Sequence, residues 1–399
     1  MLIGIVGKPN VGKSTFFKAL TLADVHIDNY PFVTIKPNEG FAHARVECAA
    51  KFFNVQCNPR VGYCIDQNRY VPIKVMDVAG LVPGAHEGKG MGNQFLDDLR
   101  QAKVLIHVID VAGTTNEVGE SVNPGSYDPA NDIKFLEEEL DFWYQGILLK
   151  GWEKFARRIV QERQEIHKAL AKQLSGLGVD EPMMEAVITQ LKLDSAKPNL
   201  WSEMDLLYIA VELRKITKPM IIVCNKADVS SAQANYERLK EQFPHLILIP
   251  CSAESELALR EAANKKLIKY LPGDSNFEIL DKTKLTDKQQ HALQFIKTHI
   301  LDVYGSTGVQ QAINTAVFDL LKLMAIFPGG VSKLADSDGN VLPDCFLLKP
   351  GSTALDFAYH LHTDLGNNFI RAIDVKTKRT VGKEYPLKSG DVIEIITAK

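Results

Sequence analysis

A glycine-rich loop near the start of the chain constrains its fold more than any other feature. The run Leu2–Val6 before the loop is short, apolar and rich in β-branched residues, as expected of a buried parallel strand. The loop itself reads Gly7-Lys8-Pro9-Asn10-Val11-Gly12-Lys13-Ser14 and matches the pattern G-x-x-x-x-G-K-S. After it, Phe16, Phe17 and Leu20 recur at helical spacing. A strand, this loop and a helix in that order predict a phosphate-binding loop (P-loop) in an α/β nucleoside-triphosphatase fold.

The residue types of the P-loop suit a magnesium-bound phosphate. Backbone N–H groups can surround the anion, and the N-terminus of the following helix adds partial positive charge. Lys13 is expected to reach the β- and γ-phosphate oxygens, and the Ser14 hydroxyl is expected to bind Mg²⁺. The predicted nucleotide contacts in the loop are Lys8, Pro9, Asn10, Val11, Gly12, Lys13, Ser14 and Thr15.

A second motif, Asp77-Val78-Ala79-Gly80, follows a strand-like run over 71–76. A carboxylate at the carboxyl end of a parallel strand lies near the nucleotide crevice of an open α/β sheet. Asp77 is therefore predicted to hold Mg²⁺ through water, and the N–H of Gly80 to contact a γ-phosphate. The next residue is Leu81, where many GTPases have a glutamine that orients water. Since Leu81 cannot polarise water, catalysis requires another group, a cation or a partner.

The motif Asn225-Lys226-Ala227-Asp228 follows an apolar run over 219–224 and indicates which base is bound. An aspartate here accepts two hydrogen bonds from guanine, from N1–H and the 2-amino group, and adenine offers no such pair of donors. Asn225 is predicted to tie this loop to the P-loop, and the Lys226 stem to cover the base. A further pair, Ser252-Ala253, follows the run 246–250 and is predicted to complete the base pocket.

With these motifs the chain resembles the Obg class of translation-associated GTPases, most closely the YchF-related branch with a C-terminal TGS domain. Segment 29–40 resembles the switch I of that class, and segment 79–93 resembles its glycine-rich switch II. The resemblance implies that Thr34 meets Mg²⁺ and the γ-phosphate. It also implies that Asn10 holds K⁺, as the matching asparagine does in cation-dependent members. YchF proteins proper carry Glu in place of the last Asp of N-K-x-D and favour ATP, so Asp228 favours GTP here.

The predicted site residues fall into a metal-binding and a catalytic group. His86 is the ionisable side chain near Leu81 that could act near neutral pH, and a solvated loop histidine is the alternative interpretation. The predicted metal ligands are Ser14, Thr34 and Asp77. The predicted catalytic residues are Asn10, Lys13, Thr34, Gly80 and His86.

The strand–helix alternation stops after the run 104–110 and resumes near Pro219. Long unstructured connections are rare in compact domains, so a helical insertion is predicted, and the resemblance implies the two-helix antiparallel arm of YchF-type proteins. The helical candidates are 132–149, 150–175, 180–192 and 202–215. We predict a G domain split over 1–112 and 204–272, a helical insertion over 113–203, a helical linker over 273–322 and a TGS domain over 323–399.

The last part of the chain places β-like runs around one helix-like run. The strand candidates are 345–349, 369–372 and 392–396, with a helix over 353–362 and Ser352 as its candidate N-cap. Phe327-Pro328-Gly329-Gly330 is predicted to mark the boundary before it. This pattern resembles a TGS domain, a small β-grasp module, which implies contact with RNA or the ribosome. The predicted fold class is therefore α/β: a P-loop NTPase G domain with an inserted helical arm and a C-terminal β-grasp (TGS) domain.

Composition limits the kinds of partner. A net charge of −3 argues against a strong global attraction to nucleic acid, so RNA contact requires local patches. One candidate is a basic stretch in the insertion, for which a solvated helix face is the alternative: Lys150, Lys154, Arg157, Arg158, Arg163, Lys168 and Lys172. No apolar run is long enough to span a membrane, and the opening strand leaves no room for a signal peptide, so a cytoplasmic protein is expected. The 6 cysteines contain no C-x-x-C pair or zinc-knuckle spacing and favour buried free thiols.

Together these patterns predict a slow GTPase with GTP, GDP and Mg²⁺ as ligands and K⁺ as a further cation. Hydrolysis of GTP to GDP and phosphate would act as a conformational switch on the ribosome or structured RNA in translation. Neither DNA nor a membrane is expected as a partner, and a monomer is favoured. The alternatives are a YchF-like ATPase, a nucleotide-gated scaffold with negligible turnover, and a sensor whose TGS domain binds a small ligand.

Overall fold

The computed structural model describes residues 1–21, 38–78 and 99–398, and its central element is a mixed β-sheet. In the described part the strand order is β2-β4-β1-β5-β6-β7, with β3 also paired to β4. Strands β1, β4, β5, β6 and β7 run parallel, whereas β2 and β3 run antiparallel to β4. The strands are β1 (Leu2–Val6), β2 (Glu39–Glu47), β3 (Tyr63–Ile65), β4 (Asn68–Asp77), β5 (Val104–Asp110), β6 (Met220–Asn225) and β7 (Ile247–Pro250).

Alternate residues of the parallel strands face two separate hydrophobic cores. Ile3, Ile5 and Val108 belong to the core beneath α1 (Lys13–Thr21), α9 (Ala253–Asn264) and α12 (Val309–Asn314). Leu105 and Ile222 belong to the other core, with α3 (Ala130–Leu149), α7 (Glu203–Thr217) and α8 (Ala232–Gln242). Every residue of β1 and β5 is buried, as expected of central parallel strands covered on both faces.

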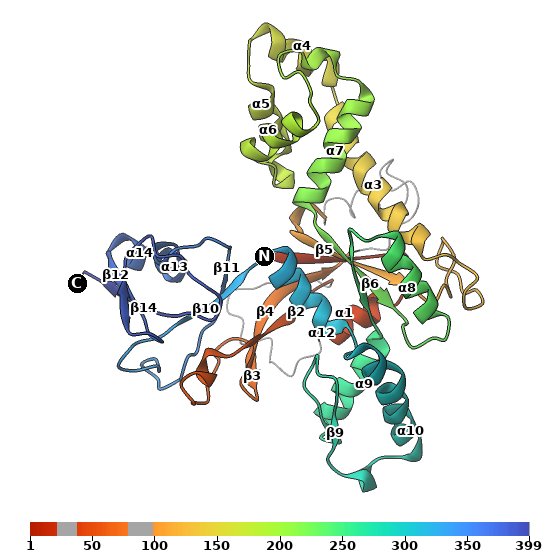
Figure 1. Cartoon of the computed structure of the whole chain (residues 1–399), viewed down its shortest axis with the longest axis vertical. Helices are drawn as coiled ribbons and strands as arrows, with labels where there is room; N and C mark the ends of the chain where they lie inside the picture. Colours follow the sequence, from red (N-terminus) through yellow and green to blue (C-terminus); the bar gives the residue numbers. More distant parts are fainter. Residues whose placement is uncertain (22–37, 79–98, 399) are drawn as a thin grey trace.

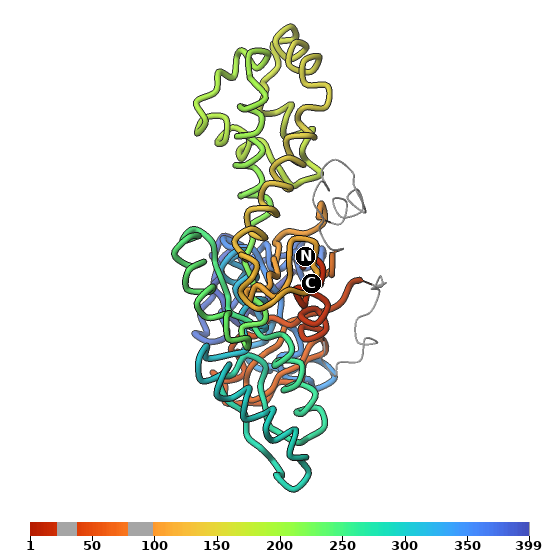
Figure 2. The backbone as a smooth tube through the Cα atoms, turned by 90° about the vertical axis from the view of Figure 1, so that its right-hand side faces the viewer, coloured from red at the N-terminus to blue at the C-terminus, as the bar shows by residue number. Residues whose placement is uncertain are grey.

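The inserted segment forms a long helical arm that projects from the sheet (Figures 1 and 2). Helices α3 and α7 run along each other, and their root is fixed by Arg214, which donates to Asp141 Oδ1 (2.8 Å) and Glu137 Oε1 (3.2 Å). At the far end the rings of Trp152 and Trp201 stack at 5.7 Å. The arm helices are α3 (Ala130–Leu149), α4 (Trp152–Gln161), α5 (Ile166–Leu174), α6 (Glu181–Gln190) and α7 (Glu203–Thr217).

The helices expected in the insertion are confirmed, with one difference. The single helix predicted over 150–175 is two helices, because the chain turns between α4 and α5, where Arg163 adopts a left-handed φ of 53°. Asp180 caps α6 and Ser202 forms a capping box with Asp205 at the start of α7, so both helices begin where short polar side chains accept the first N–H groups. The domain limits predicted near 203 stay a prediction, although α7 packs along α3.

After β7 the chain forms several short elements. Helix α9 ends at Asn264, and β8 (Ile268–Lys269) then pairs with β9 (Glu278–Ile279). Helix α10 (Asp287–Ile296) continues through wider turns over Lys297–Leu301 to α11 (Asp302–Tyr304). Gly305 and Gly308 then take left-handed φ values of 77° and 83°, which separates α11 from α12.

A second sheet forms the C-terminal domain, with the order β11-β10-β14-β12-β13. Thr353, and not Ser352, caps its main helix, since Thr353 and Asp356 form a capping box. Phe327 and Pro328 lie inside the first strand and do not mark a boundary before the domain, as the sequence suggested. Its elements are β10 (Met324–Pro328), β11 (Phe346–Leu348), α13 (Ala354–Leu361), α14 (Thr363–Asn367), β12 (Phe369–Asp374), β13 (Arg379–Val381) and β14 (Val392–Thr397).

Candidate nucleotide-binding site

The P-loop glycines stand where neighbouring atoms leave no room for a side chain. A Cβ at Gly7 would lie 2.4 Å from the carbonyl oxygen of Val108, and a Cβ at Gly12 would lie 2.3 Å from Nδ2 of Asn225. Gly12 also has a left-handed φ of 88°. Both positions therefore require glycine, and the loop wraps closely onto the ends of β5 and β6.

The residues predicted to meet phosphate and Mg²⁺ lie together. Lys13 Nζ donates to Asp77 Oδ1 at 2.6 Å, and the Ser14 hydroxyl donates to Asp77 Oδ2 at 3.2 Å. Asp77 ends β4 and Lys13 begins α1, so the ammonium, the hydroxyl and the carboxylate meet where the helix N-terminus opens. Oxygen donors of this kind suit Mg²⁺, and the residues present fit that ion.

Asn225 joins the P-loop to the two loops predicted to hold the base. Its amide nitrogen donates to the carbonyl oxygen of Val11 at 2.8 Å, and its amide oxygen accepts from the N–H of Ala253 at 3.0 Å. The N–H of Ala227 donates to the carbonyl oxygen of Cys251 at 2.9 Å, which binds the two base loops to each other. The tie expected between Asn225 and the P-loop is therefore present.

Asp228 is half-buried and is oriented by the second base loop. The hydroxyl of Ser252 donates to Asp228 Oδ1 at 2.8 Å and lies 2.8 Å from the hydroxyl of Ser255. Ser252 is also the N-cap of α9, accepting from the N–H of Ser255. A carboxylate held by one oxygen at the rim of a pocket can direct the other toward a pair of ligand N–H donors.

Lys226 is anchored by residues that the sequence analysis missed. Its Nζ donates to Asp110 Oδ2 at 2.9 Å and to Thr114 Oγ1 at 3.0 Å. Asp110 is fully buried and also accepts from the hydroxyls of Thr114 (2.6 Å) and Thr115 (2.9 Å). The sequence could have predicted a role for Asp110, because Asp110 ends a buried strand as Asp77 and Asn225 do.

Lys8 points away from the phosphate position into the base of the arm. Its Nζ donates to Asp132 Oδ1 (2.9 Å) and to the carbonyl oxygen of Thr115 (3.0 Å), and it lies 3.8 Å from the centre of the Tyr127 ring. Burial lowers the pKa of Lys8 and raises that of Asp132, while their mutual attraction opposes both shifts. Only the backbone of Lys8 is thus placed to serve a phosphate, and its side chain links the P-loop to α3.

Asn10 is held by the loop that follows β5. It adopts a left-handed φ of 61°, and its amide nitrogen donates to the carbonyl oxygen of Gly119 at 2.9 Å. Gly119 lies so close to the P-loop that a Cβ there would be 2.7 Å from the carbonyl oxygen of Pro9. An amide that donates through its nitrogen keeps its oxygen as an acceptor for a ligand.

Some predicted residues lie outside the part of the chain that the structure describes. These are Thr34, Gly80 and His86, together with Leu81 and the two switch-like segments. The roles predicted for them stay predictions.

Comparison with known proteins identifies the family. One family model, described as an Obg-like GTPase YGR210-like G4 motif-containing domain, matches residues 223–330. A second, described as a 50S ribosome-binding GTPase, matches residues 2–137, and a TGS domain matches residues 337–397. A GTP-binding protein from Methanocaldococcus jannaschii is 51% identical, with 100% of this chain and 99% of that protein covered.

The chain belongs to the Obg-like, YchF-related family of GTP-binding proteins with a TGS domain. The resemblance and the fold class predicted from the sequence are both confirmed. The ribosome-binding ATPase YchF from Bacillus subtilis is 28% identical, covering 98% of this chain and 97% of that protein. A crystal structure of a GTP binding protein from Pyrococcus horikoshii matches with a TM-score of 0.78 and 41% identity, covering 100% of each chain.

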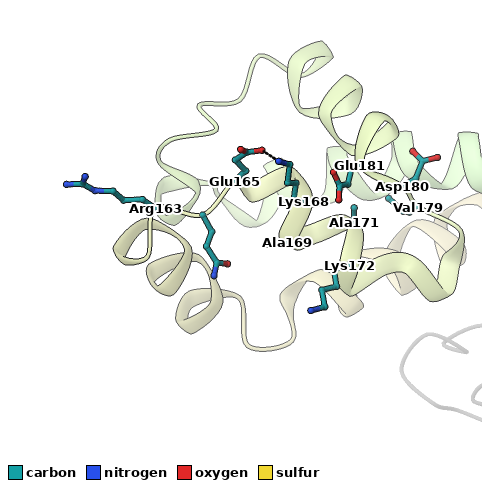
Figure 3. Close-up of a pocket in the computed structure, with 10 residues that line it drawn as sticks. Arg163, Glu165, Lys168, Ala169, Ala171, Lys172, Val179, Asp180 and Glu181 are labelled. Atoms are coloured by element: carbon teal, nitrogen blue, oxygen red, sulfur yellow. Dashed lines mark ion pairs between the residues drawn. The ribbon is translucent and has the colours of Figure 1, made fainter.

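The arm of this Obg-like protein carries a shallow hollow away from the nucleotide site (Figure 3). Lys168 and Lys172 lie on α5 at one side, and Asp180 and Glu181 lie at the start of α6 at the other. Lys168 pairs with Glu165 at 2.8 Å, so the hollow is mixed in charge. All of the basic residues singled out in this segment are exposed.

Two further observations concern the C-terminal domain and membranes. His362 caps α14, its Nδ1 accepting from the N–H of Asp364 at 3.1 Å, so it has a structural role at a helix end. Over the described residues, no helix combines the length and apolar character needed to cross a membrane.

Proposed function

We propose that this protein is a slow GTPase that uses GTP hydrolysis as a conformational switch on the ribosome or another structured RNA. The observation that carries the guanine part is the position of Asp228. Its Oδ1 accepts from Ser252, and its loop is tied through Asn225 to the P-loop. A carboxylate matched to guanine N1–H and the 2-amino group would be left unpaired by adenine, which opposes ATP.

The phosphate end of the site suggests how nucleotide enters. Lys13 is paired with Asp77 at 2.6 Å, so triphosphate binding would exchange that carboxylate for phosphate oxygens at the Lys13 ammonium. Asp77 and the Ser14 hydroxyl would then be free to orient the hydration shell of Mg²⁺. When bound, Mg²⁺ would neutralise charge on the β- and γ-phosphates. Thr34 and the N–H of Gly80 are proposed to complete this end.

Hydrolysis requires a group other than a glutamine at Leu81. We propose that the Asn10 amide oxygen holds K⁺, which would offset charge developing between the phosphates, and that His86 assists the attacking water. GTP and ATP turnover should be measured with K⁺ and with Na⁺ as the monovalent salt. Faster GTP turnover in K⁺ supports the proposal. Faster ATP turnover would make the protein an ATPase, as YchF relatives are named, and tight GTP binding without turnover in either salt would make it a gated scaffold.

A physical connection between the P-loop and the arm supports a switch. Lys8 in the P-loop and Asp132 in the first turn of α3 form a buried ion pair, with both side chains at most 5% exposed. A P-loop that shifts on nucleotide exchange would therefore act on the root of the arm. The exposed basic residues of the arm and the TGS domain are the proposed contacts with RNA phosphates.

The partner can be tested by sedimentation with purified ribosomes and subunits. The protein would be loaded with a non-hydrolysable GTP analogue or with GDP. Co-sedimentation in the GTP-analogue state alone supports a ribosome-associated switch in the cytoplasm. Absence of binding in both states would overturn the ribosome as partner and leave the nucleotide chemistry unaffected.

A further inference from the structure

Three cysteine thiols meet at one corner of the G domain. Cys48 follows β2, Cys57 lies in the connection to β3, and Cys64 lies in β3. Their sulfur atoms all lie within 4.8 Å of one another, and Cys48 and Cys57 are 3.4 Å apart. The sequence spacing gave no sign of a metal-binding knuckle, because the turn of the chain, and not a short repeat, brings these thiols together.

A fourth cysteine packs against the same corner from the other domain. Cys345 directly precedes β11 and packs, partly buried, against the hydrophobic cluster that contains Cys48 and Cys57. The residues just before Cys345 are held beside the thiols, because the Arg69 guanidinium that contacts Cys57 also donates to the carbonyl oxygens of Leu342 and Pro343.

A buried arginine supplies positive charge beside the thiols. Arg69 is 1% exposed, and its Nη1 lies 3.8 Å from the sulfur of Cys57. The corner therefore favours a thiolate, the form of cysteine that binds metals.

The spacing of the thiols suits a soft, tetrahedral ion. Zinc binds thiolates at about 2.3 Å, which places the sulfur atoms of a tetrahedral site about 3.8 Å apart. The sulfur atoms of Cys48, Cys57 and Cys64, all within 4.8 Å of one another, lie near that separation. We propose that Cys48, Cys57 and Cys64 bind Zn²⁺, with Cys345 as the fourth ligand. Four thiolates and Zn²⁺ carry a net charge of −2, which the Arg69 guanidinium partly offsets.

Such a site would fasten the TGS domain to the G domain. The N–H of Asn58 donates to the carbonyl oxygen of Val341 at 2.9 Å, and that of Arg60 donates to the carbonyl oxygen of Pro343 at 3.0 Å. The Arg69 guanidinium donates to the carbonyl oxygens of Leu342 (3.1 Å) and Pro343 (2.7 Å). Figure 1 shows the β3 end of the G domain beside the domain that carries β10. The metal would thus join two segments that the backbone already holds side by side.

The test uses the full chain and Zn²⁺ itself. Protein stripped with a chelator under reducing conditions would be titrated with Zn²⁺ against a chromophoric competitor, and bound metal would be measured by elemental analysis. We expect about one equivalent per chain, and a loss of affinity of about 100-fold or more in Cys57→Ser, since even outer-shell changes cost 10–100-fold. Cys224→Ala, which removes a buried thiol in β6, is the matched control and should bind normally.

Two measurements distinguish a metal site from cysteines that only pack together. Zn²⁺ should protect Cys48, Cys57 and Cys64 of the wild-type chain from alkylation, measured by mass spectrometry, whether or not a variant folds. Substitution with Co²⁺ should give the absorption of tetrahedral thiolate coordination. Stoichiometric Zn²⁺ binding that Cys57→Ser leaves unchanged, or a Cys48–Cys57 disulfide in protein purified under reducing conditions, would overturn the proposal. Unchanged affinity in Cys345→Ser would overturn Cys345 as the fourth ligand.

Discussion

Strand β4 has a different kind of site at each of its ends. At its carboxyl end, Asp77 meets Lys13 and Ser14, and all three offer oxygen or nitrogen atoms that suit phosphate and a hard cation. At its amino end, Arg69 pairs in register with Cys64, and the thiols suit a soft ion. The 10 residues of β4 hold the two ends about 30 Å apart at about 3.3 Å per residue.

The two ends also differ in what holds them in place. At the nucleotide end, polar side chains orient one another, and several keep an atom accessible for a ligand. At the cysteine end, a buried guanidinium and backbone carbonyls bind two domains together. We therefore expect changes at the nucleotide end to alter ligand binding most, and changes at the cysteine end to alter stability and the attachment of the TGS domain.

The largest effect is expected from Asp228→Ala, measured as GTP affinity. The change would remove the two hydrogen bonds that we propose between this carboxylate and guanine, each worth about 1.5–3 kcal/mol, so affinity should fall by about 10²–10⁴-fold. Thermal stability should change little, because Asp228 is only half-buried. Calorimetric titration with GTP measures the loss, and Asp302→Ala, at an exposed position of α11, is the control. Equal affinity of wild type and Asp228→Ala for GTP would remove this residue from base recognition.

Lys8→Met tests whether the nucleotide end also contributes to stability through the arm. It leaves Asp132 buried without its cation, which should cost about 3–5 kcal/mol in the free energy of unfolding. The double variant Lys8→Met/Asp132→Leu should recover most of that loss, because apolar side chains can replace a buried ion pair. Urea denaturation measures both.

A surface ion pair between α1 and α9 gives the control for Lys8. Lys18 and Glu261 lie 3.8 Å apart with side chains 59% and 47% exposed, so Lys18→Met should cost at most about 1 kcal/mol. If Lys8→Met lowered the free energy of unfolding no more than Lys18→Met does, the ion pair between the P-loop and the arm would not contribute to stability.

Arg69→Met addresses the cysteine end. The substitution keeps an apolar stem but leaves the carbonyl oxygens of Leu342 and Pro343 without their donor, at about 1–3 kcal/mol each. We expect a loss of about 2–4 kcal/mol in urea denaturation and easier proteolysis between the domains. Arg60→Met removes a solvent-exposed ion pair with Asp344 at the same junction and should cost at most about 1 kcal/mol. If both variants lost similar amounts of free energy of unfolding, the buried hydrogen bonds of Arg69 would stabilise the protein no more than an exposed ion pair does.

At the nucleotide end, the sequence could place residues on the fold because they occupy the ends of regular strands. Asp77 and Asn225 could be placed from the apolar runs before them, and Asp110 could have been placed in the same way. The cysteine end could not be predicted, since Cys48, Cys57 and Cys64 are joined by turns whose geometry no local pattern specifies. The antiparallel strand β2 was missed for a related reason. Its residues Glu39–Glu47 mix small, polar and apolar side chains, and pairing with β4, not intrinsic preference, makes them a strand.

The smallest expected effect concerns the N-cap of α13, which the sequence suggested one residue too early, at Ser352. Thr353 accepts from the N–H of Asp356 and Asp356 accepts from the N–H of Thr353, so Thr353 is the N-cap of α13. Thr353→Ala should cost about 1 kcal/mol, the usual value for losing a cap, and should lower the melting temperature of the full chain slightly. Ser352→Ala should have almost no effect, because Ser352 lies one residue outside the helix start. Amide exchange in α13 measures the difference directly, since only loss of the true cap should speed exchange in the first turn. Faster exchange in Ser352→Ala than in Thr353→Ala would return the cap to Ser352 and show that this helix begins where the sequence alone suggested.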